Sequence, residues 1–203
     1  MRNANLSKNN QRESVWHFEK QVFNYMLPDN MACWLFDPAS LTARLINACD
    51  GQFRVRVMSQ SWGTPLWNES KRLGMRERQA ALIREVFLYC DDQAWVFART
   101  VIPRTTLSGK EKYLANLGSK PLGAVLFADP NMRRDQFEVT CLREGDLLYA
   151  HANQLTNSKP TEIWGRRSGF YLSDKPLLVN EIFLPSIAQC RSARRPSPFA
   201  RHR

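Results

Sequence analysis

Residues 81–103 read ALIREVFLYCDDQAWVFARTVIP, and this stretch carries the strongest indication of the fold. Apolar, β-branched and aromatic residues fill 81–90 and 94–103, and Asp91-Asp92-Gln93 separates the two runs. This pattern predicts two antiparallel strands joined as a hairpin. Both faces of 81–90 are largely apolar, which indicates a central strand of the sheet.

Other segments carry weaker patterns of the same kind. Strands are predicted at 53–57, 136–143, 163–172 and 177–184, and helices at 15–27, from Ser40 to about residue 50, and from about 108 to 118. Residues 62–80 are predicted to be irregular, and residues 144–156 to be either helix or loop. Because strands outnumber helices and short links dominate, we expect an α+β fold, a single antiparallel sheet with helices packed on one face.

The length and composition indicate one globular domain. The chain has 203 residues, of which 43% are hydrophobic. We expect a flexible N-terminus at 1–14, the domain at 15–186, and a basic, disordered tail at 187–203. No apolar stretch approaches the ~20 residues of a membrane span, and the N-terminus lacks the apolar core of a secretory signal, so a cytoplasmic location is predicted.

The five cysteines are scattered, odd in number and without the Cys-x-x-Cys spacing, which argues against a disulfide framework and against a zinc site. We therefore predict reduced, partly buried thiols and no bound metal. The three histidines also lack metal-ligand spacing, and neither His17 nor His202 is interpreted as a catalytic base.

The net charge of +10 raises the possibility of a nucleic-acid partner. However, half of that charge lies in the tail, at Arg191, Arg194, Arg195, Arg201 and Arg203. The tryptophans at positions 16, 34 and 95 lie in apolar patterns typical of a core, so we expect no nucleic-acid partner. A basic surface also suits an anionic metabolite.

Two charged residues interrupt apolar strand faces. Glu181 shares a face with Leu177, Val179 and Phe183, and a carboxylate in such a place is either a structural ion-pair partner or a working acid or base. Arg84 lies on the largely apolar face of 81–90 and stays charged, so it needs an anion. An internal salt bridge between Arg84 and Glu181 is one interpretation, and a ligand that binds Arg84 is the other.

Two further hypotheses concern arginines. If the turn of the hairpin is centred between Asp91 and Asp92, Arg84 lies opposite Arg99, and two facing cations would need an anion between them or would splay apart. In the pair Arg166-Arg167, alternation lets only one side chain face the core, and the other is most simply a solvated charge at a sheet edge.

Several short motifs resemble, in order and spacing, those of the chorismate pyruvate-lyase family. They are RTVIP at 99–103, TLSG at 106–109, LGSKPLG at 117–123, LF at 126–127, WGRRS at 164–168, and LSDKPLL at 172–178 followed by Glu181 and FLP at 183–185. The resemblance is firm from about residue 84 to 185 and weaker over 15–79. The stretch 139–163 is longer than in the shortest members, and the Arg-rich tail is additional.

The resemblance implies conversion of chorismate to 4-hydroxybenzoate and pyruvate, the first committed step toward ubiquinone, without metal or organic cofactor. It implies a chorismate lyase-like fold that encloses its ligand, with this substrate and product as its partners. We predict a monomer. The family's ligand positions fall on Met31, Arg84, Leu122 and Glu181. Arg84 would hold the ring carboxylate, Glu181 would mediate proton transfer, and Met31 and Leu122 would contribute backbone N–H groups or apolar walls.

A non-catalytic domain of the same fold that binds a small effector is the alternative function. Such domains follow a DNA-binding helix-turn-helix in some bacterial regulators, and the residues before Val15 are too few to form one. Release of pyruvate from chorismate distinguishes the two functions.

Overall fold

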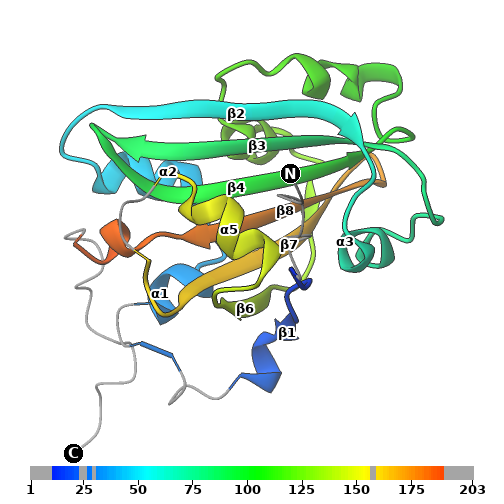
Figure 1. The fold of residues 1–203 in the computed structure, drawn as a ribbon. Helices are drawn as coiled ribbons and strands as arrows, with labels where there is room; N and C mark the ends of the chain where they lie inside the picture. Colours follow the sequence, from blue (N-terminus) through cyan, green and yellow to red (C-terminus); the bar gives the residue numbers. More distant parts are fainter. Residues whose placement is uncertain (1–10, 23–26, 29–30, 156–158, 190–203) are drawn as a thin grey trace, which may run out of the picture.

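The computed structural model describes residues 11–22, 27–28, 31–155 and 159–189. Within these ranges, antiparallel strands form one eight-stranded sheet in the order β1-β6-β7-β8-β4-β3-β2, with β5 paired to β7 (Figure 1). The strands are β1 His17–Phe18, β2 Phe53–Gly63, β3 Ala81–Cys90, β4 Gln93–Pro103, β5 Arg133–Arg134, β6 Glu138–Leu142, β7 Ile163–Leu172 and β8 Lys175–Phe183.

Short helices connect and cover these strands. The α-helices are α1 Ala32–Leu35, α2 Leu41–Ala48, α3 Trp67–Arg72, α4 Leu122–Ala128 and α5 Leu147–Asn153, and the 3-10 helices are η1 Glu19–Gln21, η3 Gly109–Asn116 and η4 Pro185–Gln189. None of the helices in the described part of the chain is long and apolar enough to span a membrane.

The prediction of a single antiparallel sheet with helices is confirmed, but the helices lie on both faces rather than on one. Apolar residues of α1 and α2 pack against Val86 and Leu88 of β3, and Leu126 of α4 packs against the same face. Helix α5 packs against Phe87 and Phe97 on the opposite face, so that α2 and α5 lie on opposite sides of the sheet (Figure 1). The reason is that β3 is apolar on both faces, and both must be removed from water.

Two local predictions were wrong. The segment predicted as a helix at 15–27 contains β1, where His17 and Phe18 pair with Val139 and Glu138 of β6; residues 23–26 of that segment lie outside the described residues. The segment 62–80, predicted to be irregular, contains the end of β2 and all of α3. In both places pairing or packing with distant parts of the chain overrides the local pattern.

The β3–β4 hairpin contains a bulge. It begins in the predicted register, with Cys90 opposite Gln93, but Leu88 pairs with Val96, so Trp95 is an extra residue on β4. Trp95 is buried in the apolar core, which holds the bulge in place. A one-residue shift moves all later side chains of one strand to the other face.

Because of this bulge, Arg84 and Arg99 do not pair as predicted. Arg84 lies opposite Thr100, and Arg99 lies opposite Glu85. Because side chains alternate along each strand, Arg84 and Arg99 project from opposite faces of the sheet. The hypothesis of two facing cations is therefore wrong, and each arginine has its own surroundings.

The β7–β8 hairpin has no bulge and keeps its register throughout. Arg166 lies opposite Glu181, and Arg167 lies opposite Asn180. Both arginines are buried, so the predicted solvated edge charge is wrong for this pair. The reason is that β7 is flanked by β6 and β8 and is covered on both faces.

The prediction of reduced thiols is also wrong for two cysteines. Cys49, at the end of α2, and Cys90, at the end of β3, form a disulfide, with Cα atoms 5.6 Å apart. The two cysteines are 41 residues apart in the sequence, so no local pattern indicates that they pair. Among the described residues, Cys33 and Cys141 take no part in a disulfide.

The predicted domain boundaries stay predictions, because residues 1–10 and 190–203 lie outside the described residues. The chain already contacts the domain just before residue 15. Arg12 forms an ion pair with Asp146, and the carboxylate of Glu13 accepts hydrogen bonds from the backbone N–H groups of Trp67 and Asn68 at the start of α3.

Candidate active site

A pocket lies between one face of the sheet and the helices α2 and α4. Its empty volume is about 570 Å³, which includes the space at its open mouth. Strands β3, β4 and β8 form its floor, and most of its lining is apolar. The lining residues are Leu41, Thr42, Val55, Arg84, Val86, Leu88, Ala98, Thr100, Pro121, Leu122, Gly123, Leu126, Phe127, Arg134, Phe170, Val179 and Glu181. A mostly apolar pocket with a few polar groups is typical of a small-molecule site.

Arg84 is a buried cation on the floor of this pocket. It is 2% exposed, and its guanidinium donates to the side-chain oxygen of Gln60 at 3.1 Å and to the Lys120 carbonyl at 3.5 Å. Within the part of the chain that the structure describes, no carboxylate forms an ion pair with it. Burial lowers the pKa of Arg84 below its ordinary value, as expected for a cation without an anionic partner.

Glu181 has a different ion-pair partner from the predicted one. Its Oε2 accepts a hydrogen bond from Nε of Arg166 at 2.6 Å, and Nη2 of Arg134 lies 3.8 Å from the same oxygen. The proposed internal salt bridge between Arg84 and Glu181 is therefore wrong. Both contacts with described residues fall on Oε2, which leaves Oε1 for a ligand in the pocket.

The sheet sets the relative position of these two groups. Arg84 is opposite Thr100, which is opposite Val179, and Glu181 lies two residues beyond Val179 along β8. Arg84 and Glu181 are thus two strands apart across the sheet and two residues apart along it. For ordinary strand spacing, their Cα atoms are about 12 Å apart. A ligand of one aromatic ring with a polar group at each end fits between side chains placed this way.

Leu122 lies in the wall of the pocket and Met31 does not. Leu122 begins α4, and the next residue, Gly123, allows α4 to approach α2, because a Cβ atom there would lie 2.6 Å from Oγ1 of Thr42. Met31 packs in the apolar cluster that also contains Val86, and its backbone N–H already donates to the Pro28 carbonyl. Three of the four predicted ligand positions therefore meet at one pocket, and the role of Met31 stays a prediction.

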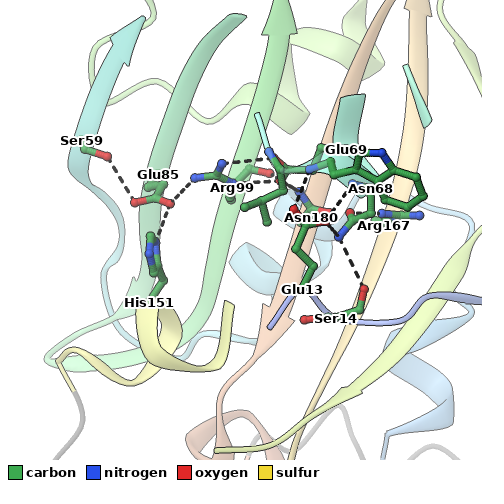
Figure 2. A network of polar contacts seen from close by, with 12 residues as sticks. Glu13, Ser14, Ser59, Asn68, Glu69, Glu85, Arg99, His151, Arg167 and Asn180 are labelled. Carbon is green, nitrogen blue, oxygen red and sulfur yellow. Dashed lines mark hydrogen bonds and ion pairs between the residues drawn. The ribbon is translucent and has the colours of Figure 1, made fainter. Parts of the chain in front are cut away.

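A second group of charges lies on the opposite face of the sheet (Figure 2). Arg99 forms ion pairs with Glu69 of α3 and with Glu85 of β3, and Glu85 also contacts His151 of α5. Asn180 donates to Glu69 and joins this network to β8. Arg99 is thus the cation that both carboxylates share, and these contacts attach α3 and α5 to this face of the sheet.

Further along the same face, Glu138 receives hydrogen bonds from Arg72 and Arg167. Arg167 also donates to the side-chain oxygen of Asn68 (Figure 2). Arg167 is thus a structural residue, whereas Arg166, its neighbour, faces the pocket side and holds Glu181. In the described part of the chain, no group of three or more His, Cys, Asp or Glu side chains is placed to hold a metal ion.

Glu85 is expected to make the fold sensitive to acid. Burial raises the pKa of Glu85, but hydrogen bonds and attraction from His151 and Arg99 outweigh burial and lower it to about 2, against an ordinary value of 4.5. Its stabilising contribution is therefore complete above about pH 4.5 and is lost as the pH falls toward 2. The loss amounts to about 3 kcal/mol of unfolding free energy.

Denaturant unfolding at a series of pH values between 6 and 2 measures this effect. We expect the Glu85→Gln variant to lose less stability than the wild type over that interval, and the exposed Glu77→Gln variant to follow the wild type. An unchanged pH dependence in Glu85→Gln would show that other carboxylates cause the acid sensitivity.

Sequence reasoning missed two arginines near Glu181. Arg166 could have been found, because a tight turn at Ser173 and Asp174 places it opposite Glu181, and both turn residues have the positive φ typical of such hairpins. Arg134 gave no signal of its own, since it lies on a strand of two residues.

The sequence model of the family described as chorismate lyase matches residues 11–192. A protein of Aromatoleum aromaticum named probable chorismate pyruvate-lyase is 40% identical over 165 residues, which cover 80% of this chain and 89% of the relative. One of Methylococcus capsulatus with the same name is 40% identical over 157 residues, which cover 77% of this chain and 96% of the relative.

A solved structure supports the fold alone. It is a gene product of Staphylococcus aureus subsp. aureus N315, which superposes with a TM-score of 0.51 at 15% identity and covers 73% of this chain and 90% of its own.

Proposed function

The chain belongs to the chorismate lyase family, and from this premise we propose that it converts chorismate to 4-hydroxybenzoate and pyruvate in the pocket beneath α4. The observation that carries the proposal is the state of Arg84. It is a buried guanidinium without a carboxylate partner among the described residues, and it lines the same pocket as Glu181. Burial of an unpaired charge costs free energy, so an anionic ligand is the partner that we propose for Arg84.

The substrate is placed by its charges and its ring. The planar guanidinium of Arg84 binds the ring carboxylate through two parallel hydrogen bonds. Apolar side chains such as Val86, Leu122 and Phe127 surround the ring. The carbon atoms that react lie at the other end of the ring, where Glu181 projects from β8.

The reaction removes one proton and breaks one bond on the ring. A proton leaves C4, the C3–O bond breaks, and a double bond forms between C3 and C4, so that the ring becomes aromatic and keeps its C4 hydroxyl group. The enolpyruvate that leaves with the bonding electrons takes up a proton on its methylene carbon and becomes pyruvate. Overall no proton is gained or lost, so one group can accept the proton and return it.

Glu181 is the group proposed to move this proton. The guanidinium groups of Arg166 and Arg134 attract an ionised carboxylate, which is the form that accepts a proton. Arg166 is fully buried and also donates to the carbonyls of Trp34 and Asp37, so it holds Glu181 at one orientation. Positioned proton transfer contributes typically about 10²- to 10⁴-fold to a rate.

The proposal is tested by mixing the purified protein with chorismate. We expect pyruvate and 4-hydroxybenzoate to appear in equal amounts, with pyruvate measured by coupled reduction with lactate dehydrogenase and 4-hydroxybenzoate by chromatography. Heat-denatured protein gives the background of spontaneous decay. Binding of chorismate without release of pyruvate would favour the effector-binding alternative, and absence of both would contradict the proposal.

Three further statements stay predictions. They are the place of this reaction as the first committed step toward ubiquinone, the cytoplasmic location, and the monomeric state.

A further inference from the structure

A second arginine of the pocket, Arg134, lies near Glu181 but has not yet been assigned a group of the ligand. It projects from β5, which pairs with the outer side of β7, so it approaches the pocket from the side opposite to Arg84. Its side chain is only 11% exposed, although its strand neighbour Arg133 is 59% exposed. Because side chains alternate along a strand, Arg133 projects into solvent and Arg134 is enclosed.

Arg134 is held firmly but keeps donors free. Its Nε donates to the hydroxyl of Ser168 at 3.1 Å, and one Nη1 hydrogen is directed to the Pro38 carbonyl at 3.2 Å. Rings of Phe137 and Phe170 lie 4.2 and 4.9 Å from the guanidinium carbon. Of its five N–H donors, those of Nη2 make no hydrogen bond with the described residues and lie 3.8 Å from Oε2 of Glu181.

The charges around the pocket do not balance. Arg84, Arg134 and Arg166 contribute three guanidinium charges, and among the described residues Glu181 is the carboxylate that lines the pocket, where it contacts Arg134 and Arg166 but not Arg84. The nearby Asp37 is engaged with its own partner, Arg44. Burial, together with repulsion from Arg166, lowers the pKa of Arg134 to about 10, although attraction from Glu181 and Asp37 opposes this shift.

The surplus therefore equals two positive charges, and chorismate carries two carboxylates. The ring carboxylate lies para to C4 and belongs to Arg84. The second carboxylate is on the enolpyruvyl group at C3, next to the carbon that faces Glu181. Arg134, whose free donors lie beside Glu181, is the cation at that end of the pocket.

We propose that Arg134 binds the enolpyruvyl carboxylate, so that it contributes to the affinity for the dianionic substrate and not to the affinity for the monoanionic product. This inference rests on the proposed function. The product 4-hydroxybenzoate retains the carboxylate that Arg84 binds but lacks the one assigned to Arg134. Arg84 thus contributes to the affinity for both molecules, and Arg134 contributes to the affinity for substrate only.

The experiment compares two stable ligands by calorimetry. One is 4-hydroxybenzoate, and the other is 3-(carboxymethoxy)-4-hydroxybenzoate, which carries a second carboxylate at the C3 position and cannot react. In Arg134→Met we expect affinity for the dicarboxylate to fall about 10- to 100-fold, the range for a lost hydrogen bond to a charged group, while affinity for 4-hydroxybenzoate changes less than about threefold. KM for chorismate is expected to rise by a similar factor.

Two further variants serve as controls. Arg133→Met removes a cation from the adjacent position on the same strand and should leave both affinities unchanged. Arg134→Lys keeps the charge without the planar fork, so it should lose part of the affinity for the dicarboxylate only, and it carries the test if Arg134→Met does not fold.

Three outcomes would overturn the inference. One is an equal loss of affinity for both ligands in the Arg134 variants. Another is unchanged affinity for the dicarboxylate. The third is a fall in kcat with KM unchanged, which would mean that Arg134 acts on Glu181 and not on the ligand. A wild-type protein that releases no pyruvate would contradict the proposed function instead. The comparison of the two ligands would still test separately whether Arg134 binds the second carboxylate.

Discussion

Replacing Glu181 with glutamine is expected to lower the turnover of chorismate about 10²- to 10⁴-fold and to leave the binding of 4-hydroxybenzoate nearly unchanged, because the variant keeps the shape of the side chain and loses its ability to accept a proton. Steady-state kinetics gives the first quantity and calorimetry the second. Wild-type turnover in Glu181→Gln would end the acid–base role.

The structure shows why this variant needs a matched control. Glu181 is the carboxylate partner of the fully buried Arg166, and breaking a buried ion pair typically costs about 3 to 5 kcal/mol of stability. A loss of activity could then come from unfolding alone. The double variant Glu181→Gln with Arg166→Met removes both charges, and we expect it to recover stability but not turnover. Recovery of turnover in this double variant would show that Glu181 is only a structural partner.

Replacing Arg84 with methionine is expected to weaken the binding of both chorismate and 4-hydroxybenzoate by about 10- to 100-fold, since both carry the ring carboxylate. Calorimetry with 4-hydroxybenzoate and KM for chorismate measure the two effects. Stability should not fall, because the variant replaces a buried cation without a carboxylate partner by an apolar side chain of similar length. Unchanged affinity for both ligands would reject the role of Arg84 as the carboxylate anchor.

The matched control for Arg84 is Arg99, on the opposite face of the sheet. Arg99 is equally buried but is paired with Glu69 and Glu85. Arg99→Met leaves these carboxylates without their shared partner, so we expect a loss of about 3 to 5 kcal/mol of unfolding free energy and normal affinity for 4-hydroxybenzoate in the folded protein. The two arginines should therefore give opposite results in the binding and unfolding experiments.

This contrast would also distinguish the arginine that we propose to bind a ligand from the one that supports the fold. A cation with carboxylate partners supports the fold, whereas a cation that is buried without one reduces stability and is retained for a ligand. These two arginines lie on opposite faces of the sheet. The network of Glu69, Arg99 and Glu85 fastens α3 and α5 (Figure 2), and the pocket side keeps its surplus of positive charge.

Strand alternation was enough to place several residues correctly from sequence. The faces of β3 and β8 follow from the period of two that the backbone imposes, so Arg84 was correctly grouped with Val86, and Glu181 with Val179. The resemblance to the chorismate pyruvate-lyase family added Leu122, which lines the same pocket.

Pairing between strands was predictable only where the hairpin is regular. The tight turn at Ser173 and Asp174 determines the register of β7 and β8, but the bulge at Trp95 shifts β4 against β3. No local signal marks that bulge, because it depends on a tryptophan that enters a core built from several other segments. The error reversed the predicted relation between Arg84 and Arg99.

Alternation and turn chemistry act between residues that are neighbours in the chain, so they were sufficient to predict the sheet, its central hairpin and the two charged positions on apolar faces. The pairing of the charges became visible only in the folded chain. Folding paired Glu181 with Arg166, assigned Glu69 of a six-residue helix to Arg99, joined Cys49 to Cys90, and brought Arg134 to the pocket. The physical reason is that the partners of a buried charge come from distant segments, and their distances are set by the packing of the whole domain.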